Sequence, residues 1–175
     1  MQKIVYYVAV SLDGYICDEQ RNVSDFIQEG AGVEAYHSDL QLFDTVIMGR
    51  HTYEFGYRYG LKPGQPAYPG MRHYIFSDKL KLENTSGEVQ VVKPGKKAVA
   101  EIRRSAEKDI YLCGGGILAG WFLRNNMIDE LKLKLNPVVL GSGVKLFENL
   151  ESSIRFQLVG HQAFADGMII LTYRC

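Results

Sequence analysis

The chain has 175 residues, enough for one domain with a substantial hydrophobic core. Twenty basic and twenty acidic side chains cancel, which argues against a surface that attracts nucleic acid or an anionic membrane. The three cysteines are far apart and form no CxxC pair, which argues against a disulfide framework or a zinc site and fits a reducing cytoplasm. No apolar run approaches the ~20 residues of a membrane span, and no linker divides the chain. We therefore expect a single cytoplasmic domain over residues 1–175.

The first half of the chain alternates between apolar runs and helical patterns. Residues 4–10 are nearly all apolar, β-branched or aromatic, which predicts a central strand buried on both faces. Residues 17–32 are polar and predict a long loop, a length at which loops are often functional. The elements expected next are an amphipathic helix over 33–43, a buried strand over 45–48, a short helix over 51–55 and a loop over 56–70.

The second half continues the alternation and ends in strands. The expected elements are strands over 73–76, 89–92 and 110–113, with helices over 97–107 and 116–125. Residues 130–135 alternate leucine with lysine, which predicts a half-exposed strand. Residues 156–164 and 168–173 flank Ala165-Asp166-Gly167, a hairpin signal. The pattern predicts a mixed α/β sheet with helices on both faces, closed by antiparallel strands.

Three consecutive glycines, Gly114, Gly115 and Gly116, separate the predicted strand 110–113 from the predicted helix 116–125. Glycine allows a sharp turn and a close approach of ligand to backbone. The free N–H groups and dipole at the start of the following helix favour an anion. The run is therefore typical either of a site for a phosphate-bearing cofactor or of a tight strand-to-helix turn.

Two other predicted strands also end in ligand-type residues, and ligands of parallel α/β sheets bind beyond the carboxyl ends of strands. Gly49-Arg50-His51-Thr52 follows one strand and Ser77 follows another. Arg50 can form a bidentate pair with a phosphate, and Arg50 with Ser77 suits a 2′-phosphate, which favours NADP over NAD. Taken singly, Arg50 is typical of a surface ion pair and Ser77 of a turn. Together with the glycine run they predict a dinucleotide laid across the sheet edge.

A Rossmann fingerprint is the first alternative for the glycine run. Gly114, Gly116 and Ala119 satisfy G-x-G-x-x-A. That fingerprint opens a βαβ unit followed by further parallel strands, whereas this run comes late in the chain, and we expect antiparallel strands after it. We therefore reject the Rossmann interpretation and keep the nucleotide.

At this point the motifs match a family. The segments 8–16 (VAVSLDGYI), 46–54 (VIMGRHTYE), 75–77 (IFS) and 111–116 (YLCGGG) resemble, in order and spacing, the dihydrofolate reductase superfamily. The resemblance spans nearly the whole chain. It implies a three-layer α/β/α fold with a mostly parallel sheet of about eight strands and an antiparallel C-terminal hairpin, and it implies NADPH as hydride donor. By position, the nicotinamide would be faced by Ala9 and Ile16. The adenosine phosphates would be held by Gly49, Arg50, His51, Thr52 and Ser77, and the pyrophosphate by Gly114, Gly115, Gly116, Ile117 and Leu118.

Two segments indicate the branch of the superfamily. Residues 136–147 and the motif Ser11-Leu12-Asp13-Gly14 resemble the reductase of bacterial riboflavin biosynthesis (RibD C-terminal domain-like), including its stand-alone members. That likeness implies hydride transfer to an imine or carbonyl carbon of a pyrimidine- or pterin-like substrate, such as 5-amino-6-(5-phosphoribosylamino)uracil. A true dihydrofolate reductase, or a nucleotide-binding regulatory protein without catalysis, stays open. Dihydrofolate reductases carry a Trp-x-x-Pro-like segment in the first loop; here Phe26-Ile27 stands there.

Several residues are candidates for the substrate side. The acid that dihydrofolate reductases carry on the first helix falls near Val33 or Glu34, so Glu34 is a candidate catalytic acid, or else a helix-dipole partner. Asp13 could orient the substrate or the nicotinamide, or be a turn residue. Phe26 and Tyr57 are candidate substrate contacts. Tyr57, Tyr59 and Tyr68 could stack on a planar substrate or simply pack the long loop. The scattered histidines predict no metal site. The resemblance also allows a homodimer, with contacts through residues 131–135 or the C-terminal hairpin.

Overall fold

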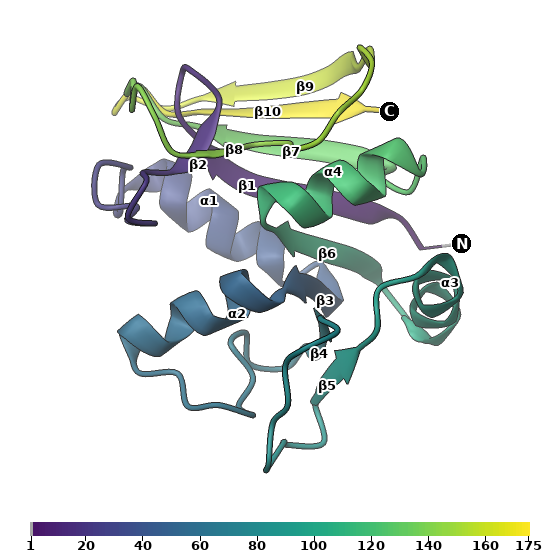
Figure 1. Cartoon of the computed structure of the whole chain (residues 1–175). Coiled ribbons are helices and arrows are strands. Elements are labelled where there is room, and N and C mark those ends of the chain that lie inside the picture. Colours follow the sequence, from purple (N-terminus) through teal and green to yellow (C-terminus); the bar gives the residue numbers. More distant parts are fainter. Residues whose placement is uncertain (1) are drawn as a thin grey trace.

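The computed structural model describes residues 2–175, and an eight-stranded sheet with the order β5-β4-β3-β6-β1-β7-β10-β9 forms its centre (Figure 1). Helices and strands alternate along most of the chain. Their bounds are β1 Ile4–Val10, β2 Tyr15–Cys17, α1 Ala31–Leu40, β3 Phe43–Gly49, α2 Arg50–Phe55, the 3-10 helix η1 Gly56–Tyr59, β4 Arg72–Phe76, β5 Val89–Val92, α3 Lys96–Ser105, β6 Asp109–Gly114, α4 Gly116–Arg124, β7 Glu130–Leu135, β8 Val144–Lys145, β9 Gln157–Ala163 and β10 Ile169–Arg174.

The sheet is mostly parallel, as expected, and β10 is antiparallel to both of its neighbours. The expectation that only antiparallel strands follow the glycine run is wrong for β7, which pairs in parallel with β1 along Val5–Val10. Helix α4 forms the crossover that allows this direction. Strands β2 and β8, which the sequence did not indicate, pair with each other in a small separate sheet. Helix α1 ends earlier than predicted because Phe43 begins β3.

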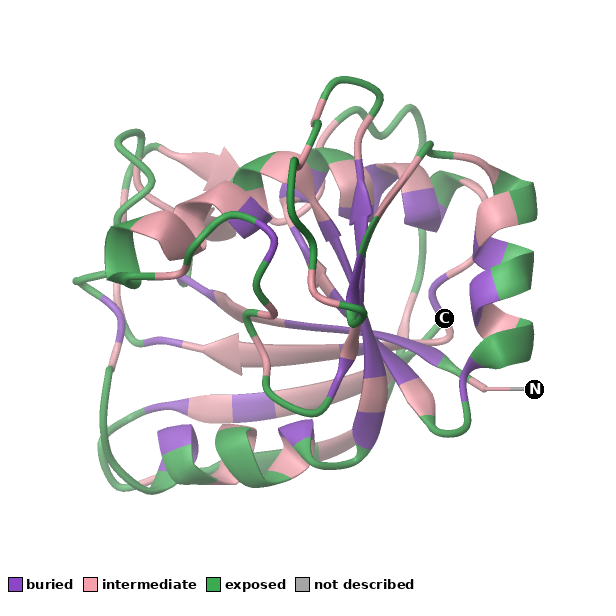
Figure 2. Ribbon diagram, turned by 90° about the horizontal axis from the view of Figure 1, so that it is seen from below, coloured by how far each residue is buried: buried purple, intermediate pink, exposed green. Residues whose placement is uncertain are grey.

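Buried central strands lie between helical layers (Figure 2), and the side chains on their two faces pack against different helices. Along β1, Ile4 and Tyr6 belong to the core beneath α3 and α4. Val5 and Tyr7, on the opposite face, belong to the core beneath α1 and α2. Because strand side chains alternate between faces, a continuous apolar run is required when both faces are covered. The prediction that residues 4–10 form a central strand is therefore confirmed.

The leucine–lysine alternation of β7 has a different cause from the one expected. Leu131 and Leu133 pack in the core beneath α3 and α4, but the lysines do not face open solvent. Lys132 and Lys134 are the register partners of Tyr7 and Ala9 and therefore lie on the face that α1 covers. The Lys132 side chain is only 17% exposed. The alternating pattern thus places two lysines on the helix-covered face, where their ammonium groups lie over the rings of Tyr7 and Tyr36.

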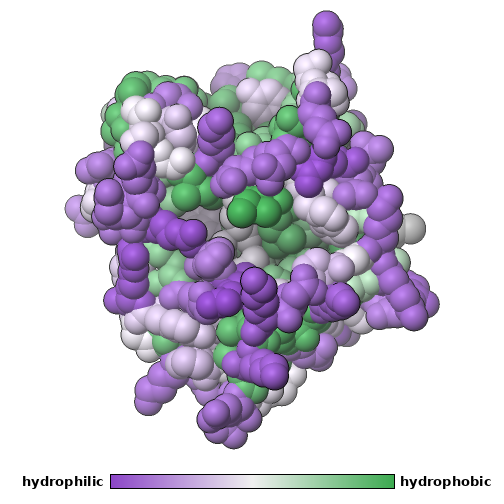
Figure 3. Space-filling view, viewed as in Figure 1, coloured by the Kyte–Doolittle hydropathy of each residue, from purple (hydrophilic) through white to green (hydrophobic). Residues whose placement is uncertain are grey.

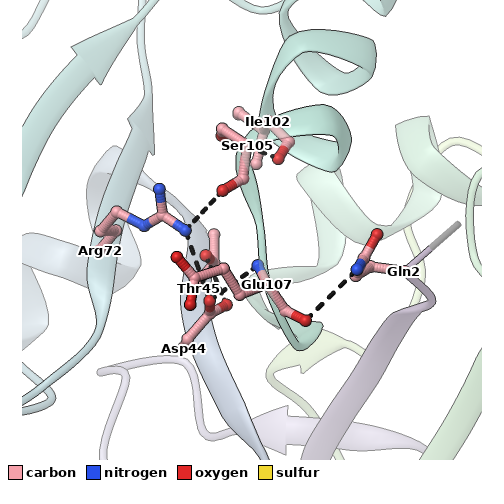
Figure 4. A network of polar contacts seen from close by, with 7 residues as sticks. All are labelled: Gln2, Asp44, Thr45, Arg72, Ile102, Ser105 and Glu107. Atoms are coloured by element: carbon pink, nitrogen blue, oxygen red, sulfur yellow. Dashed lines mark hydrogen bonds and ion pairs between the residues drawn. The ribbon is translucent and has the colours of Figure 1, made fainter.

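A polar network ties the amino-terminal ends of β3, β4 and β6 together, far from the glycine run (Figure 4). Asp44 accepts hydrogen bonds from the Glu107 backbone N–H (2.9 Å) and the Thr45 hydroxyl (2.9 Å) and pairs with Arg72 (3.4 Å). Partial burial raises the pKa of Asp44, but these hydrogen bonds outweigh it and hold the pKa below its ordinary value. Arg72 also donates to the Ser105 carbonyl (2.7 Å), so it serves this network.

No helix within residues 2–175 is both long enough and apolar enough to cross a bilayer.

Candidate functional site

A cavity of about 1050 Å³ lies at the carboxyl ends of β1, β3, β4 and β6. The space-filling view shows a hollow with apolar walls and a hydrophilic rim on the face that carries α2 and α4 (Figure 3). The volume reaches the upper end of the range of about 300–1,000 Å³ typical for small-molecule sites. The cavity therefore has room for an elongated cofactor together with a second molecule.

The glycine run forms one wall of this cavity at the start of α4. Gly115 is the N-cap of the helix, and its peptide bond to Gly114 is cis. A Cβ on Gly115 would lie 3.4 Å from Thr52 Oγ1 and 3.6 Å from Ile16 Cδ1, within the cavity lining. A Cβ on Gly116 would lie 2.1 Å from the Lys145 carbonyl oxygen. The close approach of the Lys145 backbone therefore depends on the missing side chain of Gly116, whereas Gly115 is at ordinary contact distance from Thr52 and Ile16.

Polar residues at the ends of β3 and β4 form the adjoining wall. Arg50 Nε donates to Glu54 Oε1 at 2.7 Å, which aligns the guanidinium along α2 while its terminal nitrogens can still reach a ligand. His51 lies 3.8 Å from the same carboxylate. The Ser77 hydroxyl accepts hydrogen bonds from the backbone of Lys79 and Leu80. The surface-pair and turn roles considered for Arg50 and Ser77 are therefore present, at the rim of the cavity.

The structure brings together nearly all the residues predicted for the cofactor. The predicted residues that line the cavity are Ala9, Ile16, Gly49, Arg50, His51, Thr52, Ser77, Gly115, Gly116, Ile117 and Leu118. Gly114 lies behind the lining, where its φ of +102° and the ring of Tyr6 leave no space for a side chain. Arg124 lines the same cavity and was not singled out from the sequence.

The residues predicted for catalysis and substrate contact lie elsewhere. Glu34 is exposed on α1 and does not line the cavity, because the side of the helix that reaches it carries Tyr36. Phe26 is buried beneath the first loop, at 4% exposure, and Tyr57 also lies outside the lining. Counting residues along the sequence identified the helix, α1, but could not show which of its faces reaches the cavity.

Asp13 holds a turn together. Its carboxylate accepts hydrogen bonds from the Ser11 hydroxyl (2.6 Å) and from the backbone of Leu140 (3.1 Å) and Gly141 (2.7 Å). The Ser11 hydrogen bond lowers the pKa of Asp13, and the two backbone N–H groups add to this effect. The geometry matches the turn role considered for Asp13, because the motif Ser11-Leu12-Asp13-Gly14 connects the end of β1 to the loop after β7.

A second wall, which the sequence analysis largely missed, consists of aromatic side chains and one lysine. Its members are Tyr7, Tyr36, Tyr68, Tyr111, Cys113 and Lys134. The hydroxyls of Tyr36 and Tyr111 share a hydrogen bond of 2.9 Å, and the Tyr68 hydroxyl lies 3.5 Å from Cys113 Sγ. Burial raises the pKa of Tyr36 to about 12 and keeps this hydroxyl neutral at pH 7. Only Tyr68 was considered beforehand; the register between β1 and β7 would have been needed to find Lys134.

The described residues contain no cluster of histidine, cysteine, aspartate and glutamate that could hold a metal ion. Within the cavity lining the carboxylates are Asp78 and Glu148, which lie after β4 and β8 and not on α1. The tyrosine-rich wall therefore combines neutral hydroxyls, a thiol and a single ammonium group.

Comparison with known proteins agrees with this architecture. The protein YwjB of Bacillus subtilis (strain 168) is 33% identical over 175 residues, covering 95% of each chain. The structure of a candidate riboflavin biosynthesis protein from Shewanella sp. PV-4 superposes with a TM-score of 0.78 at 26% identity, covering 99% of this chain and 98% of that one. A dihydrofolate reductase from Enterococcus faecalis, in complex with NADP(H), shares the fold at a TM-score of 0.68 and 14% identity, covering 98% and 95%. Residues 2–170 match the RibD C-terminal domain family, and with the sheet order and cavity described above the chain belongs to that family.

Proposed function

We propose that the protein is an NADPH-dependent reductase of the riboflavin-biosynthesis type, which reduces an imine or carbonyl carbon of a pyrimidine- or pterin-like substrate. The observation that carries the proposal is the division of one cavity into two unlike walls. A glycine-rich, basic wall runs over the ends of β3, β4 and β6, and a tyrosine-rich wall lies between α1 and β7. Ala9 and Ile16 line the cavity together with the residues of these two walls.

The residues of the first wall fit a dinucleotide. The cradle at Gly115 has space where a side chain would otherwise contact Thr52 and Ile16. The first N–H groups of α4 would hold the pyrophosphate, and Arg50 with Ser77 would hold a 2′-phosphate. A nicotinamide cofactor would supply the hydride, and this chain's residues would position it. Ala9 is small enough to let a flat ring lie against β1.

The second wall fits a flat heterocycle. Tyrosine rings offer faces for stacking, and their neutral hydroxyls can donate hydrogen bonds to ring oxygens and nitrogens. A true dihydrofolate reductase is the less favoured alternative, because the resemblance implies that dihydrofolate reductases carry an acid on the first helix, whereas Glu34 is exposed and does not line the cavity. The aminopyrimidine of riboflavin biosynthesis makes no such demand on α1.

The cofactor half of the proposal is tested by titrating the purified protein with NADPH and NADH and following binding by calorimetry. We expect NADPH to bind well below millimolar concentration and more tightly than NADH. Replacing Arg50 with Ala should weaken NADPH by roughly 1.5–3 kcal/mol, because a charge-assisted pair to the 2′-phosphate is lost, and should weaken NADH less. Arg104→Ala, on the exposed face of α3, is the matched control. Equal losses for both cofactors would remove the 2′-phosphate assignment.

The substrate half is tested by assaying dihydrofolate and 5-amino-6-(5-phosphoribosylamino)uracil side by side with NADPH. We expect oxidation of NADPH with the aminopyrimidine. Turnover of dihydrofolate alone would favour the dihydrofolate reductase alternative, and tight NADPH binding without turnover of either compound would favour a nucleotide-binding regulatory role.

A further inference from the structure

Lys134 places a positive charge on the tyrosine-rich wall. It lies on β7, in register with Ala9 of β1, so its side chain leaves the sheet on the same face as Ala9. Its Nζ lies 4.7 Å from the centroid of the Tyr36 ring, and the residue lines the cavity. Burial lowers the pKa of Lys134, because its ammonium group has lost part of its water shell.

Lys132 provides an internal comparison two residues away on the same strand and the same face. Its Nζ lies at the same distance, 4.7 Å, from the centroid of the Tyr7 ring. In contrast to Lys134, it pairs with the Asp39 carboxylate of α1 at 2.5 Å. Within residues 2–175 no carboxylate forms an ion pair with Lys134. The fold therefore neutralises one of the two sheltered lysines and leaves the other facing the cavity.

The groups around Lys134 do not supply the missing negative charge. Tyr36 lies beneath it on α1, and its hydroxyl is engaged with that of Tyr111. The β-strand partners on either side, Ala9 and Ile170, are uncharged. A cation held among neutral rings is stabilised when an anion enters the same space, since the interaction is strong where water is excluded.

We propose that Lys134 is the group that selects the substrate, and that it binds a negatively charged oxygen of a flat ring held among the tyrosines. The ligand class is a planar heterocycle that carries an enolate-type or otherwise anionic oxygen in the plane of its ring. This assignment rests on the reductase function proposed above, since it places the ring next to Ala9, where a nicotinamide would lie. It adds that, among the pyrimidine- and pterin-like rings of that function, rings with an anionic oxygen bind more tightly than neutral rings of the same shape.

Uracil and barbiturate form a suitable pair of probes, because both are flat six-membered rings but only barbiturate is an anion at pH 7. Each is titrated into the protein saturated with NADP⁺. We expect barbiturate to bind at least tenfold more tightly than uracil, which corresponds to about 1.4 kcal/mol at 25 °C. Lys134→Met should reduce this ratio to about one, and Lys134→Arg, which keeps the charge, should retain most of it.

A double variant serves as the control, Lys132→Met with Asp39→Asn, because it removes the neighbouring ion pair without changing the net charge. It should preserve the preference for barbiturate. An equal affinity of the wild-type protein for both rings, failure of both to bind, or an unchanged ratio in Lys134→Met would each overturn the proposal. NADPH binding is measured on the wild-type protein and on every variant. A wild-type protein that does not bind NADPH would contradict the proposed reductase function itself. A wild-type protein that binds NADPH but shows no preference for barbiturate would contradict only the role of Lys134.

Discussion

His73 is a fully buried histidine whose two ring nitrogens both have backbone partners. Nδ1 lies 2.9 Å from the Met71 carbonyl, and the Tyr68 N–H donates to Nε2 at 3.0 Å. Since Nε2 accepts, the proton of the neutral ring belongs on Nδ1. Burial lowers the pKa of His73 to about 4. A protonated ring would turn the Nε2 acceptor into a donor facing the Tyr68 N–H, so the neutral form is the one that the fold requires.

We predict that His73 makes the protein less stable as pH falls through the mildly acidic range. The pKa falls from its ordinary 6.5 to about 4 in the fold. Between pH 6.5 and about pH 4, the unfolded chain therefore binds a proton at His73 that the folded chain does not bind. The neutral ring favours the folded state fully above pH 6.5, and this advantage is lost as the pH falls towards 4. Between pH 7 and pH 5 the loss should be about 2 kcal/mol. Urea unfolding across this range measures it.

His73→Gln is the control for this measurement, because glutamine does not titrate. The variant is expected to be less stable at every pH, but its stability should fall by about 2 kcal/mol less than that of the wild type between pH 7 and pH 5. Parallel curves for the two proteins would mean that carboxylates such as Asp44, and not His73, account for the acid sensitivity.

At the scale of elements, the segment after β8 packs its backbone directly on α4. The Glu148 N–H donates to the Gly116 carbonyl at 3.0 Å. A Cβ at Gly116 or Gly120 would lie 2.1 or 2.0 Å from a backbone oxygen of this segment. Tyr6 contributes from below by donating its hydroxyl hydrogen to the Leu146 carbonyl at 3.1 Å. The two glycines, one helical turn apart, thus allow residues 145–148 to cover α4, the helix whose N-terminus is proposed to bind the pyrophosphate.

We predict that Gly120→Ala destabilises the protein although alanine favours helices. Overpacking against the Glu148 carbonyl should cost about 1–3 kcal/mol, which exceeds the gain of about 0.5–1 kcal/mol from helix propensity. Thermal unfolding would measure the change. Gly87→Ala is the matched control, since a Cβ there meets no atom within 4 Å. A Gly120→Ala protein as stable as the wild type would show that segment 145–148 moves aside at little cost.

The order of elements could be predicted from the sequence because each central strand is a short apolar run and each helix has its own periodicity. The glycine-rich wall could be predicted for the same reason: its residues follow strand ends directly, so knowledge of the strands located them. The opposite wall was not accessible. Lys134 requires the register of β7 against β1, and the choice of Tyr36 over Glu34 requires the rotation of α1 on the sheet. Both depend on tertiary packing, which no local sequence pattern specifies.

For the whole molecule, the sheet order limits how two copies could associate. Strand β7 lies between β1 and β10 and has no free edge, so the expectation of a contact through residues 131–135 has no strand edge to support it. Strand β9 is the outer strand at that end, and Leu158 and Val159 on it are 50% and 44% exposed. An uncovered edge without lysine or proline is suited to pairing with another strand. The homodimer stays a prediction, and the hairpin is the favoured of its two expected contacts.

We expect sedimentation equilibrium to give the mass of a dimer for the wild type and of a monomer for Val159→Lys, since a charge on an edge strand opposes pairing. Val139→Lys is the control, because Val139 is also an exposed valine, at 65% exposure, but lies outside β9. A monomeric wild type would end the dimer prediction, and a dimeric Val159→Lys would place the contact elsewhere.

Cofactor binding should also act on the whole molecule, because the proposed phosphate wall draws on β3, β4, β6 and α4 together. At a hundredfold excess of NADPH over its dissociation constant, we expect a stabilisation of about 2.7 kcal/mol. For a chain of this size the unfolding temperature should rise by roughly 5–10 °C. Differential scanning calorimetry with equal concentrations of NADPH and NADH would measure it, and an equal shift with both would contradict the proposed preference.

The two walls of the cavity meet at β6 and otherwise come from different parts of the chain, and this has an evolutionary consequence. Tyr36, Tyr68 and Lys134 come from α1, the loop before β4, and β7, whereas the glycine-rich wall comes from the ends of β3, β4 and β6. Under the proposed function, mutations in the first set would alter the choice of ring while the second set continued to hold the same hydride donor. A gene for such a fold can therefore be duplicated and diverge in substrate without having to reinvent its source of reducing power.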